Sequence, residues 1–348
     1  MDFKRYLNET AKILDKEISK ILDEWEKEVG KISPKLIPLA QAFIKACSGG
    51  KRIRGTLVRL GYEMTQTHLP GEVTGVTASS HLEGGILKVG AAYEIFHTSI
   101  LVHDDIMDES PIRRGKPTLF KALGGDHRGT SLAITLADLG FFLAIKIISE
   151  SKFPNKEKNE ALRLFSKTVV NTTVGQILDI QKEDPILTSR LKTAQYTICG
   201  PLALGAILAG ADKKLLGLLG LFGENLGMAF QIHDDILGVF GDEKKVGKSV
   251  TSDIDEGKNT LLITYALEHT DLNQKEILNK YYGKGKLSKS GLLEIRKIFK
   301  ECGSLRFSRQ KEVEYVEEAK KVIPKITIDY RLSRMLTQMA DFLVERVS

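Results

Sequence analysis

Three aspartates stand close together in the segment LVHDDIMDESPIRRG, residues 101–115. Residues three and four apart on a helix are neighbours, so Asp104, Asp105 and Asp108 would share one face. Crowded carboxylates repel one another and raise one another's pKa unless a cation lies between them. We expect that cation to come from outside the sequence, and Arg113 and Arg114 follow in the same segment.

A second acidic pair, Asp234 and Asp235, lies in QIHDDILGVFGDEKKVGK, 130 positions after the first pair. The pentads VHDDI and IHDDI are nearly identical, and each ends a strongly apolar segment. One such pair is usually a solvated acidic edge, but two pairs in apolar flanks favour a shared ligand. Because Mg²⁺ prefers carboxylates and substrate phosphates, we predict several Mg²⁺ ions between the two clusters around one diphosphate. His103 and His233 are predicted to pack or to contact the metal-binding residues without binding the ion, since Mg²⁺ disfavours imidazole.

Basic residues indicate two regions that could bind phosphate. GGKRIRG, residues 49–55, places Lys51, Arg52 and Arg54 beside a predicted helix start, and it does not match the P-loop pattern. The second region is the loop that holds Lys248 and Lys258, together with Lys244 and Lys245. Either loop alone could simply be a solubilising surface. Lys192 and Thr193, in RLKTAQYT, add two side chains that could donate hydrogen bonds to phosphate.

The elements that must position these residues are predicted to be helices. Apolar residues recur with helical spacing from Leu7 to Trp25 and again over residues 84–108, 132–150, 158–181, 191–210, 213–239, 260–268, 291–302 and 309–322. Strand alternation is weak, and KITIDY, residues 325–330, is its best candidate. The Pro-, Gly- and charge-rich breaks do not resemble interdomain linkers. We therefore predict one all-α domain over residues 1–348.

Composition limits the class of protein. The net charge is 51 − 45 = +6, and the basic residues are scattered, so composition permits a nucleic-acid partner without requiring one, and acidic small molecules fit equally well. Our prediction for the whole chain is small-molecule diphosphate substrates and no nucleic acid. The three cysteines, Cys47, Cys199 and Cys302, lack metal-type spacing and indicate free thiols in a reducing compartment. The first helix is amphipathic and not a signal peptide, and the longest uncharged run, residues 197–211, is short for a membrane span. We predict a cytoplasmic protein with no integral membrane segment.

Taken together, these motifs resemble those of the trans-isoprenyl diphosphate synthases, which include farnesyl, geranylgeranyl and longer polyprenyl diphosphate synthases. The likeness runs from about residue 49 to about residue 320, with GGKRIRG, HDDIMDESPIRRGKPT, GQILDI, KTAQYT and FQIHDDILG…GK…SDIDEGKNTL in family order. The resemblance implies a bundle of antiparallel helices around a deep central cavity, in a homodimer. It also implies a head-to-tail condensation of isopentenyl diphosphate with an allylic diphosphate.

The resemblance also implies roles for individual residues. Five aspartates would bind Mg²⁺ on the allylic diphosphate: Asp104, Asp105, Asp108, Asp234 and Asp235. Four basic residues would bind isopentenyl diphosphate: Lys51, Arg54, His97 and Arg114. Contacts to the allylic substrate would come from Arg113, Lys192, Thr193, Gln231, Lys248 and Lys258, and Gln176 and Asp179 would lie near the reacting carbons. Catalysis would then depend on Asp104, Asp105, Arg113, Lys192, Asp234 and Lys258, because they stabilise the departing diphosphate.

Two positions bear on how far the resemblance extends. The family's second motif usually has a third aspartate where this chain has Gly238; with Asp234 and Asp235 present we expect metal binding to persist, helped by Asp242. Ser99 stands five positions before Asp104, where a bulky aromatic residue in the family stops chain elongation.

We therefore predict that Ser99, with Ile95 and Phe96 one turn deeper, lines a tunnel for geranylgeranyl diphosphate or a C25–C30 product. The alternative is that Ser99 faces another helix and the tunnel closes elsewhere. Two other functions remain open, a class I terpene cyclase and an inactive regulatory subunit of a heteromeric synthase.

Overall fold

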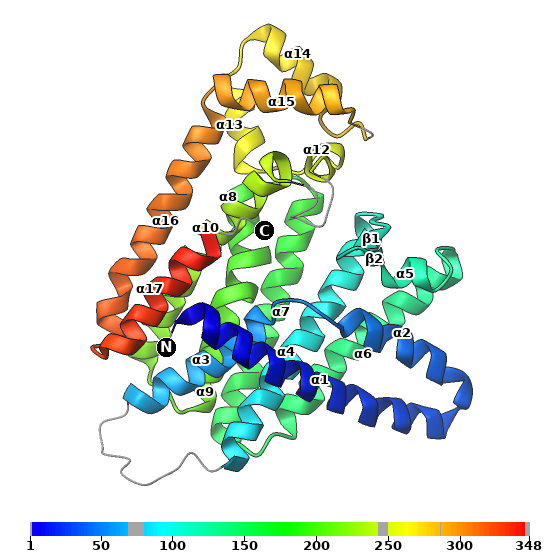
Figure 1. Cartoon of the computed structure of the whole chain (residues 1–348), viewed down its shortest axis with the longest axis vertical. Helices are drawn as coiled ribbons and strands as arrows, with labels where there is room; N and C mark the ends of the chain where they lie inside the picture. Colours follow the sequence, from blue (N-terminus) through cyan, green and yellow to red (C-terminus); the bar gives the residue numbers. More distant parts are fainter. Residues whose placement is uncertain (1, 69–79, 243–249, 286, 345–348) are drawn as a thin grey trace. The chain divides into compact units, whose positions relative to one another are not determined.

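The computed structural model describes residues 2–68, 80–242, 250–285 and 287–344 (Figure 1). The all-α prediction is confirmed, and the strands found within these ranges are only two residues long. The helices predicted from periodicity lie where they were expected, with ends that differ by a few residues. KITIDY forms no strand, because its first two residues end one helix and its last begins the next.

The elements follow one another in this order: α1 (Phe3–Ile32), η1 (Pro34–Leu36), α2 (Ile37–Cys47), α3 (Ile53–His68), α4 (Ser80–Met107), β1 (Ile112–Arg113), β2 (Lys116–Pro117), α5 (Leu119–Ala122), α6 (His127–Ser149), α7 (Asn155–Ile180), α8 (Pro185–Ser189), η2 (Arg190–Cys199), α9 (Gly200–Leu208), α10 (Lys213–Phe240), α12 (Ser252–Asp255), α13 (Leu261–His269), α14 (Leu272–Tyr281), α15 (Lys289–Glu301), α16 (Ser304–Ile326) and α17 (Tyr330–Val344).

Contacts along the chain divide it into two compact units, and the single domain over residues 1–348 stays a prediction. The first unit comprises Met1–Ser166 and Gly200–Leu216. Within it, α4 packs against α3, α6 and α1, and α3 packs against α9. A Cβ added to Gly55 on α3 would lie 2.8 Å from the carbonyl oxygen of Gly90 on α4, so these helices cross at backbone contact. Such close packing fixes the position of α4, whose last turn carries Asp104 and Asp105.

The second unit comprises Lys167–Cys199 and Gly217–Ser348. Its core joins the end of α10 to α13 and α15 through Ile236, Leu262 and Phe299, all buried. The segment η2 is a π-helix of ten residues, and two glycines of neighbouring helices lie against it. A Cβ on Gly175 of α7 would lie 2.4 Å from the Lys192 nitrogen, and one on Gly227 of α10 would lie 2.5 Å from the Cα of Ala194. Close contact on two sides therefore holds Lys192 in place.

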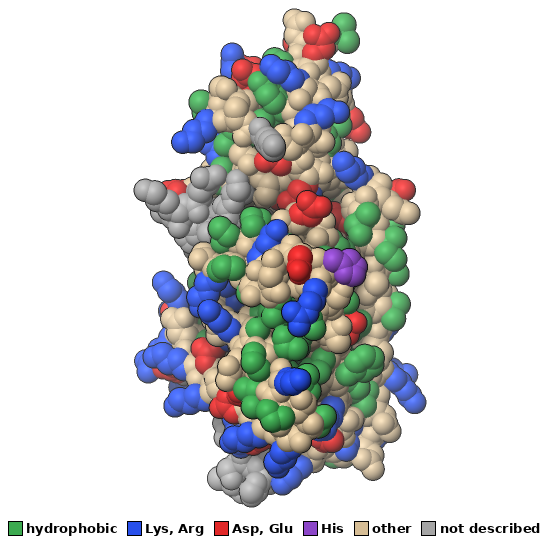
Figure 2. Space-filling model, turned by 90° about the vertical axis from the view of Figure 1, so that its right-hand side faces the viewer, with side chains coloured by type: hydrophobic (Ala, Val, Ile, Leu, Met, Phe, Trp, Pro, Cys, Tyr) green, Lys and Arg blue, Asp and Glu red, His purple; other side chains and the backbone are tan. Residues whose placement is uncertain are grey.

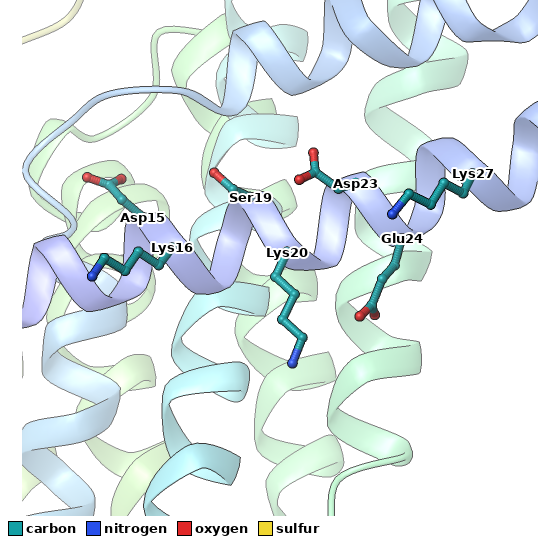
Figure 3. A pocket seen from close by; sticks show the side chains of 7 residues that line it. All are labelled: Asp15, Lys16, Ser19, Lys20, Asp23, Glu24 and Lys27. Atoms are coloured by element: carbon teal, nitrogen blue, oxygen red, sulfur yellow. The ribbon is translucent and has the colours of Figure 1, made fainter.

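Charges on the described surface are mixed. On the face drawn in Figure 2, Lys and Arg side chains are interspersed with Asp and Glu. An open hollow runs along α1 between Asp15 and Lys27 (Figure 3), lined by acidic and basic side chains of that one helix. None of the predicted catalytic or substrate-binding residues lines this hollow, so it is not the candidate active site.

Three helical segments are long and apolar enough to cross a membrane by length and composition: Gly84–Met107, His127–Ser149 and Lys213–Phe240. The segment on α6 is the least covered, with 39% of its most apolar window buried, against 67% and 56% for the other two. Its exposed apolar side chains include Phe142, at 71% exposure, and Ile145.

Candidate active site

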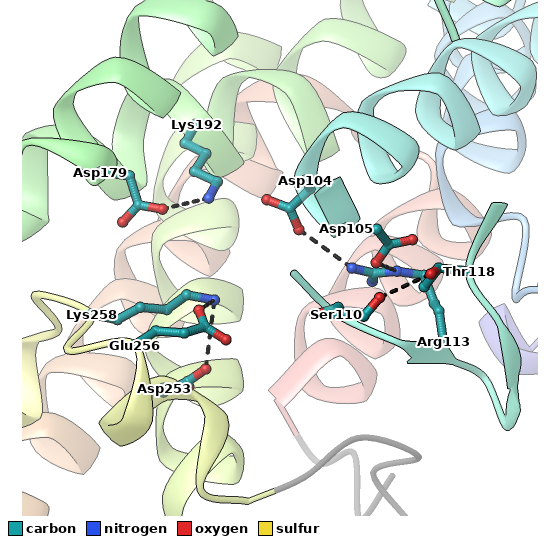
Figure 4. Close-up of polar contacts among 10 residues, drawn as sticks. All are labelled: Asp104, Asp105, Ser110, Arg113, Thr118, Asp179, Lys192, Asp253, Glu256 and Lys258. Atoms are coloured by element: carbon teal, nitrogen blue, oxygen red, sulfur yellow. Dashed lines mark hydrogen bonds and ion pairs between the residues drawn. The ribbon is translucent and has the colours of Figure 1, made fainter. Parts of the chain in front are cut away.

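In the first unit, the end of α4 and a small hairpin bring together the first aspartates and an arginine. Asp104 and Asp105 lie in the last turn of α4, and Asp108 follows directly. Arg113 returns from β1: its Nε donates to Asp105 Oδ1 at 2.6 Å and its Nη2 to Asp104 Oδ2 at 3.4 Å (Figure 4). Arg113 therefore supplies part of the neutralising charge, and the cation expected from outside the sequence stays a prediction.

The hairpin that returns Arg113 is built by its turn residues. Arg113 pairs with Lys116, and the two residues between them, Arg114 and Gly115, have φ of 53° and 71°. Positive φ at both central positions is the requirement of a type I′ turn, which matches the twist of short antiparallel strands. The hydroxyl of Thr118 donates to the Ser110 carbonyl at 2.9 Å and closes the base of the hairpin.

Burial makes the first acidic cluster suited to a cation. The pKa of Asp105 is raised to about 6, chiefly by burial and to a smaller extent by the charges of Asp104 and Asp108, while Arg113 lowers it. Within the described residues, no group of three or more His, Cys, Asp or Glu side chains forms a ready-made metal cage. One or two carboxylates that share a metal with substrate phosphates are the usual arrangement for Mg²⁺, so these residues fit that ion.

Basic residues of the first unit gather at the start of α3. Arg54 Nη1 lies 3.2 Å from His97 Nε2 on α4, and Arg114 Nη1 donates to the Gly49 carbonyl at 3.0 Å. The exposed Lys51 lies in the same loop. Burial, followed by the charges of Arg54 and Arg114, lowers the pKa of His97 well below its usual 6.5. The imidazole is therefore neutral near pH 7, and the surroundings favour an anion.

In the second unit, η2 and α10 join two predicted substrate contacts and one predicted metal ligand in one hydrogen-bonded chain. The Thr193 hydroxyl donates to Gln231 Oε1 at 2.6 Å, and Gln231 Nε2 donates to Asp235 Oδ1 at 2.7 Å. Lys192 forms an ion pair with Asp179 of α7. The residue before the second aspartate pair, His233, contacts Glu312 of α16 at 2.8 Å.

Lys258 lies between two carboxylates of the segment that precedes it. Its Nζ is 2.9 Å from Glu256 Oε2 and 3.7 Å from Asp253 Oδ1 (Figure 4). Lys248, together with Lys244 and Lys245, lies outside the described residues.

The place of the missing third aspartate is filled by another carboxylate. A Cβ added to Gly238 would lie 2.0 Å from Asp253 Oδ2. Because Gly238 has no side chain, the buried carboxylate of Asp253 can lie against α10 at this position. Asp242, which was expected to compensate, is exposed. Sequence reasoning did not assign a role to Asp253, although its spacing to Lys258 in SDIDEGK was a signal.

The three predicted chain-length residues are fully buried. A Cβ added to Gly140 of α6 would lie 2.1 Å from Ser99 Oγ, so the Ser99 side chain lies against α6. The Ser99 hydroxyl has no hydrogen-bond partner among the described residues. Phe96 packs with Phe165 at 4.8 Å between ring centroids, and Ile95 is likewise inaccessible. This contact agrees with the alternative in which Ser99 faces a neighbouring helix, and control of product length stays a prediction.

Comparison with known proteins decides the family. The polyprenyl synthetase profile matches residues 38–299. The chain is 33% identical to a geranylgeranyl diphosphate synthase of Sulfolobus acidocaldarius, over 86% of this chain and 88% of that protein. It is 31% identical to a geranylfarnesyl diphosphate synthase of Aeropyrum pernix, over 94% and 99%. The chain belongs to the polyprenyl synthetase family.

The fold agrees with solved members of the polyprenyl synthetase family. The crystal structure of a Corynebacterium glutamicum geranylgeranyl pyrophosphate synthase complexed with isoprenyl diphosphate and magnesium superimposes with a TM-score of 0.88, at 26% identity, covering 99% of this chain and 100% of that one. The chain is thus a trans-prenyltransferase with the all-α isoprenoid synthase fold, and the resemblance read from its motifs is confirmed.

Proposed function

We propose that the protein condenses isopentenyl diphosphate with an allylic diphosphate, head to tail and in the trans configuration. The observation that carries this proposal is the buried Asp105 beside Asp104 and Arg113, an arrangement that matches a metal-bridged anion. The decisive assay incubates the purified protein with labelled isopentenyl diphosphate and farnesyl diphosphate. A terpene cyclase would consume the allylic substrate alone, and an inactive subunit would consume neither.

Mg²⁺, several ions per active site, is the proposed cofactor. The residues that would hold it are Asp104, Asp105, Asp108, Asp234 and Asp235, and when bound it would neutralise the charge that develops on the departing diphosphate. The chain's own cations would act alongside: Arg113, Lys192 and Lys258 each form an ion pair with a carboxylate, and each would bind phosphate oxygens when the substrate is present. Lys51, Arg54, His97 and Arg114 would bind the second diphosphate.

The proposed product is geranylgeranyl diphosphate or a longer chain of C25–C30. The two relatives described above are named for geranylgeranyl and geranylfarnesyl products, which support the lower part of this range. A small residue at Ser99 supports extension beyond farnesyl length, whereas its contact with α6 supports closure of the tunnel elsewhere. Chromatography of dephosphorylated products measures the length directly.

We propose a cytoplasmic homodimer without an integral membrane segment, built as one domain around a deep central cavity. Ile134, Phe142 and Ile145 form an exposed apolar face on α6, and Asp138 lies on the same face at the middle of the helix. A carboxylate at the centre of a bilayer costs about 2.5–3.5 kcal/mol, so a second copy of the chain is the better cover for this face. Light scattering on Phe142→Asp, which should shift towards monomer, tests this assembly.

A further inference from the structure

Arg52, which lies between Lys51 and Arg54, is bound by other groups of the protein. Arg52 is 4% exposed and has φ of 52°, a backbone conformation that non-glycine residues adopt only when their surroundings hold them. Its Nε donates to Asp15 Oδ1 at 2.7 Å, and its Nη2 donates to the Cys47 carbonyl at 2.8 Å. Thus α1 and the end of α2 already bind the guanidinium of Arg52.

A buried carboxylate opposes Arg52 and links it to the helices that carry the basic site. Glu94 Oε2 lies 3.8 Å from Arg52 Nη1, with both side chains 4% exposed. The other oxygen of Glu94 accepts the backbone N–H of Gly55 at 2.8 Å, in the first turn of α3. Because Glu94 precedes His97 by less than one turn of α4, one carboxylate fixes the register between Arg54 and His97.

The remaining contact of Arg52 comes from outside the segment that matches the family. Asp15 lies on α1, whereas the matched residues begin at position 38. Its side chain projects from the same face of α1 as Ser19 and Asp23, and away from Lys20 (Figure 3). The carboxylate is 52% exposed, so it can be changed without opening the core.

We propose that Arg52 and Asp15 are positioning residues for isopentenyl diphosphate. The guanidinium of Arg52 joins α1, the end of α2 and α4, and this junction holds the loop so that Lys51 and Arg54 reach the diphosphate. The proposal rests on the proposed function, because it assumes that this basic site takes the isopentenyl substrate. Neither residue is among those proposed to contact the allylic substrate, so their effect should fall on one substrate only.

The test compares steady-state constants for both substrates in Asp15→Asn, Arg52→Lys and a control, Asp23→Asn, on the same face of α1. A lysine keeps the charge of Arg52 but has no planar fork to reach its three partners together. Displacement of a binding group by 1 Å can reduce rates about a hundredfold, so we expect Arg52→Lys to raise the apparent KM for isopentenyl diphosphate at least tenfold. Asp15→Asn should raise it less, and the allylic KM and kcat should stay near wild type.

Asp23→Asn should leave every constant within about twofold of wild type, as is usual for surface changes. Equal increases in both KM values, or no increase in either variant, would overturn the proposal while the proposed function stands. If Arg52→Lys fails to fold by circular dichroism, Asp15→Asn decides alone. Calorimetric titration of isopentenyl diphosphate into the wild-type protein distinguishes failure of the proposed function from failure of this inference. Absence of binding to the wild-type protein would overturn both.

Discussion

Gly238 should be intolerant of a side chain, even though most helical glycines gain stability when replaced by alanine. An added Cβ would lie 2.0 Å from Asp253 Oδ2 and 3.0 Å from its Cγ. Ordinary contact needs roughly 3.5 Å, so the carboxylate must move by about 1.5 Å. Asp253 is 5% exposed and ion-paired to Lys258, so it has little room to move.

The expected change combines two opposing effects. Replacing glycine by alanine in a helix interior stabilises by about 1 kcal/mol, and overpacking a buried site destabilises by about 1–3 kcal/mol. Gly238→Ala should therefore range from neutral to about 2 kcal/mol less stable. Gly217, on the same helix, is exposed and has no atom near its added Cβ within the described structure, so Gly217→Ala should gain about 1 kcal/mol.

Urea unfolding of both variants measures the difference, which should be about 1–3 kcal/mol in favour of Gly217→Ala. Displacement of Asp253 should also disturb Lys258 and raise the KM for the allylic substrate. Gly238→Asp would restore the usual motif of the family, yet it should lose activity, because it adds a second carboxylate where Asp253 already lies. Equal stability of the two alanine variants, or higher activity in Gly238→Asp, would refute the reasoning.

Four further perturbations test the site. Asp104→Ala should retain the fold but lose at least a hundredfold in turnover with Mg²⁺, since loss of one ligand of a charge clamp removes about 3 kcal/mol or more; turnover within tenfold would contradict the assignment. Arg54→Ala should raise the KM for isopentenyl diphosphate far more than that for the allylic substrate, and Lys258→Ala should show the reverse bias or a lower kcat; equal effects would remove the division between sites. Ser99→Phe should shorten the product if this wall sets its length, and an unchanged chromatogram would place the floor elsewhere. The pKa of His97 is lowered in the folded state, so below pH 6.5 the unfolded chain binds a proton that the folded chain does not. The free energy of unfolding should therefore decrease as the pH falls, by up to about 1.4 kcal/mol per pH unit. Urea unfolding between pH 5.5 and 7.5 should show a weaker dependence on pH in His97→Asn.

Most long helices could be predicted from sequence because apolar spacing reports which face is buried, and that signal needs no knowledge of partners. The helix α17, with 15 residues, was not among them. The hairpin of β1 and β2 was not predicted, since strands of two residues carry no alternation; the Arg114-Gly115 turn was its only local signal. The π-helical geometry of η2 was also invisible, because α- and π-helical periods cannot be separated over ten residues.

Within the site, sequence order identified the charged residues but not their pairing. The contact of Arg113 with Asp105 depends on where a tight turn returns the chain, and the junction of Arg52 with Asp15 joins residues 37 positions apart. The exchange at Gly238 is the clearest case. The sequence shows only that Gly238 lacks the carboxylate usual at this position, whereas the structure shows that the carboxylate of Asp253 lies where a side chain of residue 238 would be.

Arg113 connects the resting site to the reaction through the protonation of Asp105. Burial raises the pKa of Asp105 to about 6, and the guanidinium of Arg113, which opposes that shift, favours the ionised form at neutral pH. A carboxylate must be deprotonated to bind a metal, so a site that is already ionised accepts Mg²⁺ with little proton release. The side chain of Arg113 is 34% exposed, so it can turn from the carboxylates to an incoming phosphate without leaving the hairpin. The same arginine can thus keep Asp105 charged before the substrate arrives and neutralise the diphosphate afterwards.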